Sequence, residues 1–550
     1  MQAVLLTALL AGATANPVQK TVYTDSHDYK VVCYYGSWAV YRPGDGKFPV
    51  EEIDPFVCTH LIYGFAGLGF DNRIKSLDSW NDLKENYGRG AFERFTTNLK
   101  AKNPRLKTII AIGGWNEGSI KYSAMAESPS SRKIFVDSVV EFCKKYSFDG
   151  LDMDWEYPAS RGGKSKDKQN FLALLRELKD AFKQDNLLLT AAVSAGKHFI
   201  DPAYDIPGIS KYLDLINIMA YDFHGGWETK AGHHAPMFSR PEEPADERIL
   251  NLNYSVNYWI SQGACPKKIT LGMGLYGRTF TLRREEDNSP GDEAPQKGRA
   301  GPYTREPGSL GYNEICEDQM RDGWTVVQDP YFMSPYAFKE RQWVGYDDIS
   351  SIEVKARFAK SLGLAGGMVW SIETDDFKGK CHGYRYPLIS AINRVFAEPG
   401  IPDLPVPPSD PPTTPAPPST ASTEKTWWPR PSTSTMRPSS QSTALTSTTA
   451  TTITTTMKPD NSTIRPPETD MDSEFKCSTQ GIFRDPSNCQ VFFECVPGTD
   501  GLIAFKKECA SGTVFDPIKN QCAWPHDVPE CKGYSAPADL DIDVKQEIAS

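Results

Sequence analysis

Residues 148–158 read FDGLDMDWEYP and place an acidic residue at every second position, at Asp152, Asp154 and Glu156. In a β-strand these three side chains leave the same face. The intervening residues are mostly apolar, which favours a strand in the middle of a sheet, where unpaired charge is costly. Crowded carboxylates should raise at least one pKa, so that a proton is held near neutral pH. We predict a catalytic centre here; a solvated acidic strand is the alternative.

The rest of the N-terminal 400 residues alternates short apolar or β-branched runs with helix-like stretches such as 131–146 and 168–183. This alternation is typical of repeated βα units and a parallel sheet. The predicted strands are 30–36, 59–67, 108–115, 148–157, 187–195, 213–222, 269–277 and 365–372. Eight strands predict an α/β fold of the closed (β/α)8 TIM-barrel type, over residues 28–397. Glu156 would then lie nearest the carboxyl-terminal rim, where the active sites of such barrels are found.

The stretch between the last two predicted strands is too long for one loop and one helix. It is rich in aromatic residues, and we predict a small α+β insertion at about 279–362. A doubly wound open sheet is the main alternative fold. It would place a glycine-rich phosphate loop after the first strand, but residues 36–46, GSWAVYRPGDG, lack the G-x-G-x-x-G spacing.

Composition limits the partners and the compartment. The chain has 550 residues and a formal charge of -10, which gives no electrostatic reason to expect a nucleic acid. Residues 1–15 resemble a cleavable signal peptide, because their apolar run is followed by Ala13 and Ala15, and the run is too short to span a membrane. A membrane anchor is the alternative. We expect a secreted monomer without a membrane-embedded part.

Two segments near the C-terminus are unlike the barrel. Residues 398–473 are rich in Pro, Ser and Thr, which predicts an extended linker without a packed core, and residues 535–550 form a short acidic tail. Six of the twelve cysteines crowd into 477–531. In an oxidising compartment they predict a small β module, residues 474–534, held by disulfides, with fifteen possible pairings.

Histidines do not predict a metal site. His224, His233 and His234 lie close together in the sequence, but they lack the H-E-x-x-H or C-x-x-C spacing of zinc ligands. We therefore predict no metal and no cofactor.

Four motifs on the predicted strands resemble one family. DGLDMDWE (149–156) resembles the D-G-x-D-x-D-W-E signature of glycoside hydrolase family 18. AIGGW (111–115), MAYD (219–222) and GMVWS (367–371) resemble its motifs on the third, sixth and eighth strands. The resemblance implies retaining hydrolysis of β-1,4-linked N-acetylglucosamine, in which the substrate's own acetamide is the nucleophile.

The same resemblance implies roles for individual residues. Glu156 would be the general acid and base, Asp154 would orient the acetamide, Asp152 would share a proton with Asp154, and Tyr221 would hold the acetamide in place. The candidate residues of the substrate cleft are Tyr34, Trp38, Trp115, Met219, Asp222, Trp227, Tyr276, Arg278 and Trp370. Trp370 would form the floor under the sugar, since an indole face suits the apolar face of a pyranose.

The C-terminal module resembles a peritrophin-A type (family 14) chitin-binding domain, through CQVFFEC (489–495) and FDPIKNQCAWP (515–525). This implies binding-face aromatics Phe492, Phe493 and Trp524, and the pairs Cys477–Cys495, Cys489–Cys531 and Cys509–Cys522. In the barrel, family resemblance implies the disulfides Cys33–Cys58 and Cys316–Cys381, with Cys143 and Cys265 free and buried.

The arrangement of signal peptide, barrel, Thr-rich linker and chitin-binding module resembles arthropod chitinases. We therefore expect a secreted endochitinase whose partner is chitin. A non-catalytic chitin-binding lectin on the same barrel and an endoglycosidase acting on N-glycans are the alternatives. Members of the family that act as lectins commonly lack the terminal acid of the signature, whereas this chain keeps Glu156.

Overall fold

The computed structural model describes residues 20–321 and 323–408, and between 476 and 531 it describes 476, 478–479, 481–486, 488–498, 501–509, 514–517, 521–523 and 528–531. These residues fall into two compact units, one on each side of the predicted linker. The predicted signal peptide, most of the linker and the acidic tail lie outside the described residues. Among the helices that are described, none combines the length and apolar character needed to cross a bilayer.

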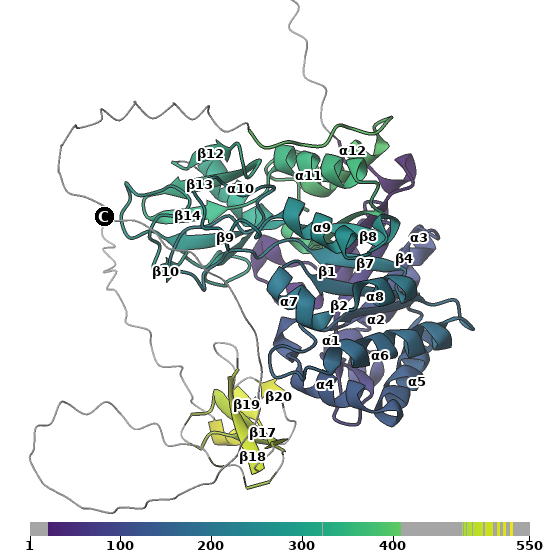
Figure 1. The fold of residues 1–550 in the computed structure, drawn as a ribbon. Coiled ribbons are helices and arrows are strands. Elements are labelled where there is room, and N and C mark those ends of the chain that lie inside the picture. Colours follow the sequence, from purple (N-terminus) through teal and green to yellow (C-terminus); the bar gives the residue numbers. More distant parts are fainter. Residues whose placement is uncertain are drawn as a thin grey trace, which may run out of the picture. The chain divides into compact units, whose positions relative to one another are not determined.

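The N-terminal unit contains a closed barrel of eight parallel strands (Figure 1). The strands are β1 (Lys30–Gly36), β2 (His60–Leu68), β4 (Lys107–Gly113), β5 (Gly150–Asp154), β6 (Leu188–Ser194), β7 (Leu215–Met219), β8 (Ile269–Gly274) and β15 (Gly366–Trp370). Each strand pairs with the next one, and β1 pairs with both β2 and β15, which closes the barrel. A short strand, β3 (Ile74–Ser76), is antiparallel to β2. The prediction of a TIM barrel is confirmed.

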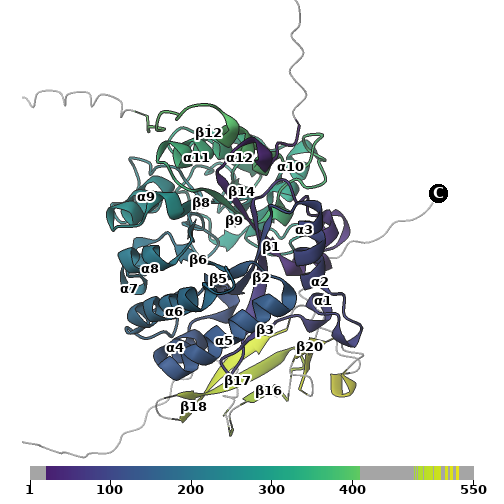
Figure 2. The same cartoon turned by 90° about the vertical axis from the view of Figure 1, so that its right-hand side faces the viewer.

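Helices surround the strands, as the view in Figure 2 shows. They are α1 (Ser79–Asp82), α2 (Ala91–Glu93), α3 (Leu99–Lys102), α4 (Ile120–Glu127), α5 (Pro129–Tyr146), α6 (Asp167–Phe182), α7 (Lys197–Ala203), α8 (Ile206–Tyr212), α9 (Leu252–Ser261), α11 (Ile349–Ser361) and α12 (Pro387–Ala397). Local signals set their ends: α5 begins after Ser128, whose side chain accepts a hydrogen bond from the Ser131 backbone, and Pro129 occupies its first position.

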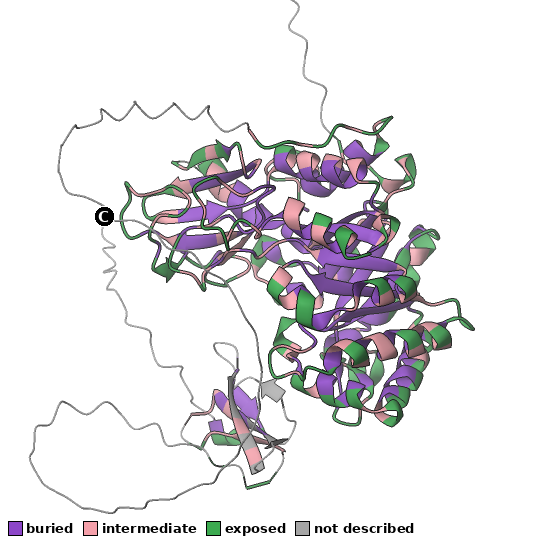
Figure 3. Cartoon of the chain, in the orientation of Figure 1, coloured by how far each residue is buried: buried purple, intermediate pink, exposed green. Residues whose placement is uncertain are grey.

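The core of the barrel has two layers of side chains, and the barrel strands that carry them are coloured mostly as buried in Figure 3. The larger layer packs the outward faces of the strands against the helices. The smaller layer fills the barrel interior, with residues such as Val32, Ile62, Ile109 and Met368. Because this interior is packed rather than open, any polar group that points into it must find its partners there.

An inserted subdomain follows β8. Its strands are β9 (Tyr276–Thr281), β10 (Gln296–Lys297), β11 (Ser309–Gly311), β12 (Thr325–Asp329), β13 (Ser334–Lys339) and β14 (Gln342–Gly345), and its helix is α10 (Tyr312–Arg321). They form an antiparallel sheet in the order β10-β9-β14-β13-β12, with β11 paired to β9. The predicted α+β insertion is therefore present. However, the predicted strand 269–277 is two strands, because the chain leaves the barrel at Gly274 and β9 starts the insertion's sheet.

The C-terminal unit is a small β module. Its strands are β16 (Gly481–Arg484), β17 (Val491–Gly498), β18 (Gly501–Glu508), β19 (Val514–Asp516) and β20 (Gln521–Ala523). The first three form one antiparallel sheet and the last two form a hairpin. The disulfide Cys489–Cys531 matches its expected pairing. Cys495 and Cys509 are also disulfide-bonded, but their expected pairs involve Cys477 and the side chain of Cys522, which lie outside the described residues.

Disulfides in the barrel unit follow the implied pattern. Cys33 on β1 is bonded to Cys58 just before β2, and Cys316 on α10 is bonded to Cys381 after β15. Cys143 is free and buried as expected. Cys265 is free but exposed, so the expectation that it is buried was wrong. It lies in the loop after α9, where the chain runs over the surface.

A buried ion pair connects the insertion to the barrel. Lys355 on α11 contacts Asp347, and both side chains are almost wholly inaccessible to water. Lys355 also donates to the carbonyl of Ala235, while Asp347 accepts hydrogen bonds from Ser334 and Ser351. A buried pair of this kind gives little net stability by itself, but removing one partner leaves an uncompensated charge.

We predict that Lys355→Met destabilises the barrel unit by about 3–5 kcal/mol, because Asp347 would remain buried without its counter-ion. Denaturant titration followed by tryptophan fluorescence measures the change. The control is Lys133→Met, which removes an exposed pair with Asp137 and should change stability by less than about 1 kcal/mol. Equal effects of the two substitutions would contradict the role given to the buried pair.

Candidate active site

The three acidic residues of the motif lie on and just after β5, at the carboxyl end of the barrel. Asp152 and Asp154 are buried, with 0% and 3% of their surface exposed. The strand is shorter than predicted: it ends at Asp154, and Glu156 lies two residues beyond it. Glu156 is therefore on the rim and half-buried, while the two aspartates point into the packed interior.

Asp152 is held by side chains from three other strands of the barrel. Tyr34 donates its hydroxyl hydrogen to Oδ2 at 2.7 Å, and Asn217 donates to Oδ1 at 3.1 Å. Thr190 also donates to Oδ1, and Thr270 in turn donates to the side-chain amide oxygen of Asn217 at 2.7 Å. Burial raises the pKa of Asp152 to about 6, although these donors counteract part of the rise. The network keeps Asp152 in one orientation behind Asp154.

Tyr34 was predicted to line the cleft, and the structure places it elsewhere. Only 1% of its surface is exposed, and its hydroxyl group is used by Asp152. It therefore supports the carboxylates from below. Asn217 and Thr190 were not predicted at all, since a single polar residue within an apolar strand leaves no distinctive pattern in the sequence.

Asp154 has an unused acceptor. Its Oδ1 atom is buried and has no hydrogen-bond partner among the described residues. Burial raises the pKa of Asp154 well above its usual value, and the neighbouring Glu156 and Asp152 raise it further. A buried acceptor without a donor is costly, and such atoms mark places where a ligand can supply the missing hydrogen bond.

Glu156 is tuned to hold a proton near neutral pH. Burial raises its pKa to about 7, the nearby Asp222 adds to the rise, and Arg161 opposes it. We expected crowding of carboxylates to be the main cause. In the structure, burial is the larger cause for all three groups, and crowding matters chiefly for Asp154.

A second polar cluster lies across the rim, after β7. Arg278 makes a bidentate ion pair with Asp222, with its Nε and Nη2 atoms 2.7 and 2.6 Å from the two carboxylate oxygens. Tyr276 donates its hydroxyl hydrogen to the same carboxylate at 2.6 Å. The guanidinium also lies 5.5 Å from the ring centre of Trp227, which is 59% exposed. Thus the structure brings Asp222, Tyr276, Arg278 and Trp227 together, and their role as cleft residues stays a prediction.

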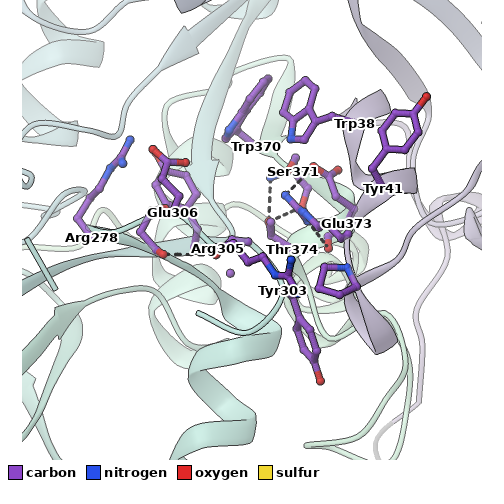
Figure 4. Close-up of a pocket in the computed structure, with 16 residues that line it drawn as sticks. Trp38, Tyr41, Arg278, Tyr303, Arg305, Glu306, Trp370, Ser371, Glu373 and Thr374 are labelled. Carbon is purple, nitrogen blue, oxygen red and sulfur yellow. Dashed lines mark hydrogen bonds and ion pairs between the residues drawn. The ribbon is translucent and has the colours of Figure 1, made fainter. Parts of the chain in front are cut away.

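Aromatic side chains line the rim near β1 and β15. Figure 4 shows Trp370 and Trp38 side by side, and their ring centres are 6.1 Å apart. Phe65, which was not predicted, packs 5.9 Å from Trp370. Tyr221 and Met219 at the end of β7 are half-buried, and the Tyr221 hydroxyl group contacts Met368 at 3.8 Å.

A cavity of about 380 Å³ opens beside these aromatics, as Figure 4 shows. Trp38, Trp370 and Arg278 line it together with residues that sequence reasoning missed, among them Tyr41 and Glu373. Glu373 is fully buried and accepts hydrogen bonds from the Ser371 hydroxyl and the Gly36 backbone, so it joins the ends of β15 and β1. Beyond the cavity, the ring of Tyr41 stacks 6.5 Å from that of Trp80, which is 53% exposed.

Two known protein families match parts of this chain. The model of glycosyl hydrolases family 18 matches residues 30–375. The chain belongs to this family. A second model, the chitin binding Peritrophin-A domain, matches residues 477–531.

Relatives of this family 18 hydrolase share much of its length. It is 37% identical over 573 residues to an endochitinase of Manduca sexta, covering 96% of this chain and 98% of the relative. It is 43% identical over 394 residues to probable chitinase 10 of Drosophila melanogaster, but it spans only 17% of that longer protein.

Solved structures agree with the fold of the hydrolase. A Group IV chitinase of Ostrinia furnacalis, in complex with allosamidin, is 45% identical with a TM-score of 0.65, over 67% of this chain and 99% of that one. Human YKL-39, described as a pseudo-chitinase with retained chitooligosaccharide binding properties, is 39% identical with a TM-score of 0.62, over 67% of this chain and 100% of that one.

The predicted aromatics of the C-terminal module differ in exposure. Phe493 is only 9% exposed, whereas Phe492 is half-buried and its ring stacks 4.3 Å from that of Phe515. Adjacent residues of a strand point to opposite faces, so the two rings cannot both lie on one binding face. Trp524 lies outside the described residues.

Of the three histidines that lie close together in the sequence, one reaches the polar cluster around Asp222. His233 is buried, and its ring bonds to the backbone of Tyr346 and Ala235. His224 contacts Glu228. His234 is buried against Tyr276, with its Nδ1 atom 3.8 Å from Asp222. Among the residues within 20–408, these three do not form a set that could share a metal ion.

We predict that Glu156 makes the stability of the barrel unit depend on pH. Its pKa is raised from 4.5 to about 7, so the folded state binds the proton more tightly than the unfolded state. This contribution to stability is complete below about pH 4.5 and is lost as the pH rises through about 7. Relative to Glu156→Gln, the free energy of unfolding of the wild type should fall by about 3 kcal/mol over this range.

Denaturant titrations at several pH values measure this difference. The control is Glu141→Gln, which removes a carboxylate that is 70% exposed and should leave the pH dependence unchanged. Parallel stability curves for wild type and Glu156→Gln would show that Glu156 does not hold its proton as described.

Proposed function

We propose that this family 18 hydrolase is a secreted endochitinase that cleaves β-1,4 linkages between N-acetylglucosamine units with retention of configuration. The observation that carries the proposal is the pairing of two groups on and just after one strand. Glu156 holds a proton near neutral pH on the rim, and Asp154 offers a buried acceptor atom without a donor. A glycosidic oxygen needs the first group, and an acetamide N–H needs the second.

In the first step Glu156 protonates the glycosidic oxygen as the bond to the anomeric carbon breaks. The acetamido oxygen of the same sugar attacks that carbon and forms a cyclic oxazolinium ion. Asp154 accepts the acetamido N–H at Oδ1 and stabilises the positive charge, and Tyr221 holds the acetamide from the end of β7. Asp152, which its hydrogen bonds hold in place behind Asp154, shares a proton with Asp154.

In the second step Glu156, now ionised, removes a proton from water. The resulting hydroxide attacks the anomeric carbon and opens the ring, which restores both the acetamide and the protonated acid. Because the nucleophile comes from the substrate, this mechanism needs no metal and no second protein carboxylate at the anomeric carbon.

The sugar chain is bound by the rim. Trp370, half-buried beneath the cavity, offers an indole face to the apolar side of the reacting sugar. Trp38, and beyond it Tyr41 and Trp80, continue the aromatic surface on one side, and Trp227 and Arg278 lie on the other side of the site. An open rim with aromatics on both sides suits cleavage within a long polymer.

The C-terminal module retains the enzyme on insoluble chitin. Residues 398–473 connect the two units, and their Pro, Ser and Thr content favours an extended linker. Tethering of this kind raises the local concentration of a catalytic site near the polymer. Secretion through the N-terminal segment accords with the disulfides of both units.

We predict that Glu156→Gln lowers the release of soluble chitooligosaccharides from colloidal chitin by a factor of about 100 or more, because the proton donor is lost. Binding to chitin should persist, as measured by co-sedimentation. The Glu141→Gln variant, changed at an exposed site, should retain full activity.

A chitin-binding lectin is the competing function, favoured by the similarity to YKL-39. It would be established by a wild-type chain that binds chitin but releases no product under any condition tested. Release of product by the wild type and its loss in Glu156→Gln are both required for the proposal to stand.

We also predict that truncation after Thr469 weakens retention on solid chitin by about tenfold or more, since the second point of attachment is removed. Hydrolysis of short soluble oligosaccharides should remain unchanged, because these substrates occupy only the barrel. Co-sedimentation and product analysis measure the two effects. A similar loss on both substrates would contradict an independent binding module.

A further inference from the structure

The loop after β5 brings positive charge to the rim of the active site. Residues 161–168 read RGGKSKDK, with four basic residues and one acidic residue. The acidic residue, Asp167, is wholly buried, whereas Arg161, Lys164 and Lys166 are exposed. The loop therefore presents cations to the solvent at the same end of the barrel as Glu156.

Hydrogen bonds hold this loop in a defined shape. Asp167 Oδ2 accepts from the backbone N–H groups of Ala159 and Lys164, at 3.2 and 2.7 Å. Its Oδ1 accepts from the Ser123 hydroxyl at 2.7 Å. A buried carboxylate with three donors fixes the backbone on both sides of Arg161, so the fold sets the point from which that side chain extends.

Arg161 makes two contacts next to the proton donor. Its guanidinium lies 3.6 Å from the ring centre of Trp115, and Nη1 donates to the backbone carbonyl of Glu156 at 3.0 Å. Trp115 remains 57% exposed, so much of its surface is open to a ligand. A cation over an indole face is attracted to the ring and therefore holds it in place, although the attraction is weak at an exposed site.

The charge of Arg161 is not neutralised by an ion pair. Among the described residues, no carboxylate lies within 4 Å of its guanidinium, whereas Lys164 of the same loop pairs with Glu127 at 2.8 Å. Across the rim, Asp222 is already paired with Arg278. The effect of Arg161 also reaches the proton donor, because Arg161 lowers the pKa of Glu156 against the stronger effect of burial.

We propose that Arg161 is a specificity-determining residue, which holds Trp115 as a platform for a sugar beside Glu156 and disfavours glucosamine units there. N-acetylglucosamine carries a neutral acetamide at the position where glucosamine carries an ammonium group. The platform therefore accepts acetylated sugar and repels deacetylated sugar. This inference rests on the proposed function and adds the acetylation state of the substrate to it.

The size of the effect follows from distance and screening. A sugar on the exposed part of Trp115 lies within a Debye length of Arg161 at moderate ionic strength, so the repulsion is felt. At a water-exposed rim the interaction of two unit charges is weak. We therefore expect a preference of about threefold to tenfold, which declines as salt is added.

The test compares a fully N-acetylated oligosaccharide with a partly deacetylated one of the same length, using the full chain. The ratio of kcat/KM for the two substrates should fall about threefold to tenfold in Arg161→Gln and should be retained in Arg161→Lys, which keeps the charge. Lys164→Gln is the matched control, because it removes a cation of the same loop that is already paired, and it should leave the ratio almost unchanged.

Binding measured by calorimetry in the Glu156→Gln background removes any effect on the chemical step. There too, Arg161→Gln should weaken the preference for the acetylated ligand. Added salt should reduce this preference in the variant that keeps Arg161 and should have no effect on it in Arg161→Gln. An unchanged ratio in Arg161→Gln, or the same loss in Lys164→Gln, would overturn the inference.

Two further outcomes separate the causes of failure. If the wild type cleaves neither substrate, the proposed function fails first. If Arg161→Gln loses activity on both substrates equally and Arg161→Lys does not restore it, the residue supports only the loop, and the assignment of specificity is wrong.

Discussion

The structure depends on burying carboxylic acids inside a packed barrel. Asp152 and Asp154 point from β5 into an interior that is otherwise filled by apolar side chains, where an ionised group lacks water. The fold meets this constraint in two ways. Side chains on three other strands donate hydrogen bonds to Asp152, and burial raises the pKa of Asp154, which favours its neutral form. The catalytic character of Glu156 follows from the same burial, at the point where the strand ends.

A barrel suits this constraint because its strands end on one rim. Each strand can supply one polar side chain to a common point, while the apolar layers below exclude water. The insertion after β8 extends the same principle. β9 begins two residues after the barrel strand ends, and it carries Tyr276 and Arg278 to Asp222. The buried ion pair between Lys355 and Asp347 attaches the end of the insertion to the barrel helix α11.

Much of this arrangement could be predicted from the sequence. The strand count, the barrel and the insertion followed from periodicity and spacing, and the acidic motif identified the central strand. Some of the predictions that failed concerned the surroundings of a residue, and others concerned the bounds of a strand. Tyr34 lies near the end of a predicted strand, as a cleft residue would, but it is buried under Asp152. Cysteine is usually a buried residue, but Cys265 lies in a surface loop. The predicted strand 269–277 is divided because the chain passes from one sheet to another. The apolar pattern of a single segment does not show which strand it will pair with.

The sequence by itself determined the order of strands, the spacing of Asp152, Asp154 and Glu156, and the family to which those motifs belong, because each is a local pattern along the chain. Only the tertiary structure decided which polar groups meet. Tyr34, Thr190 and Asn217 reach Asp152 from three different strands, and Arg161 covers Trp115 from a loop 46 positions further along the chain. Such contacts arise from the closure of the barrel, which sets the environment of each acid and therefore its pKa.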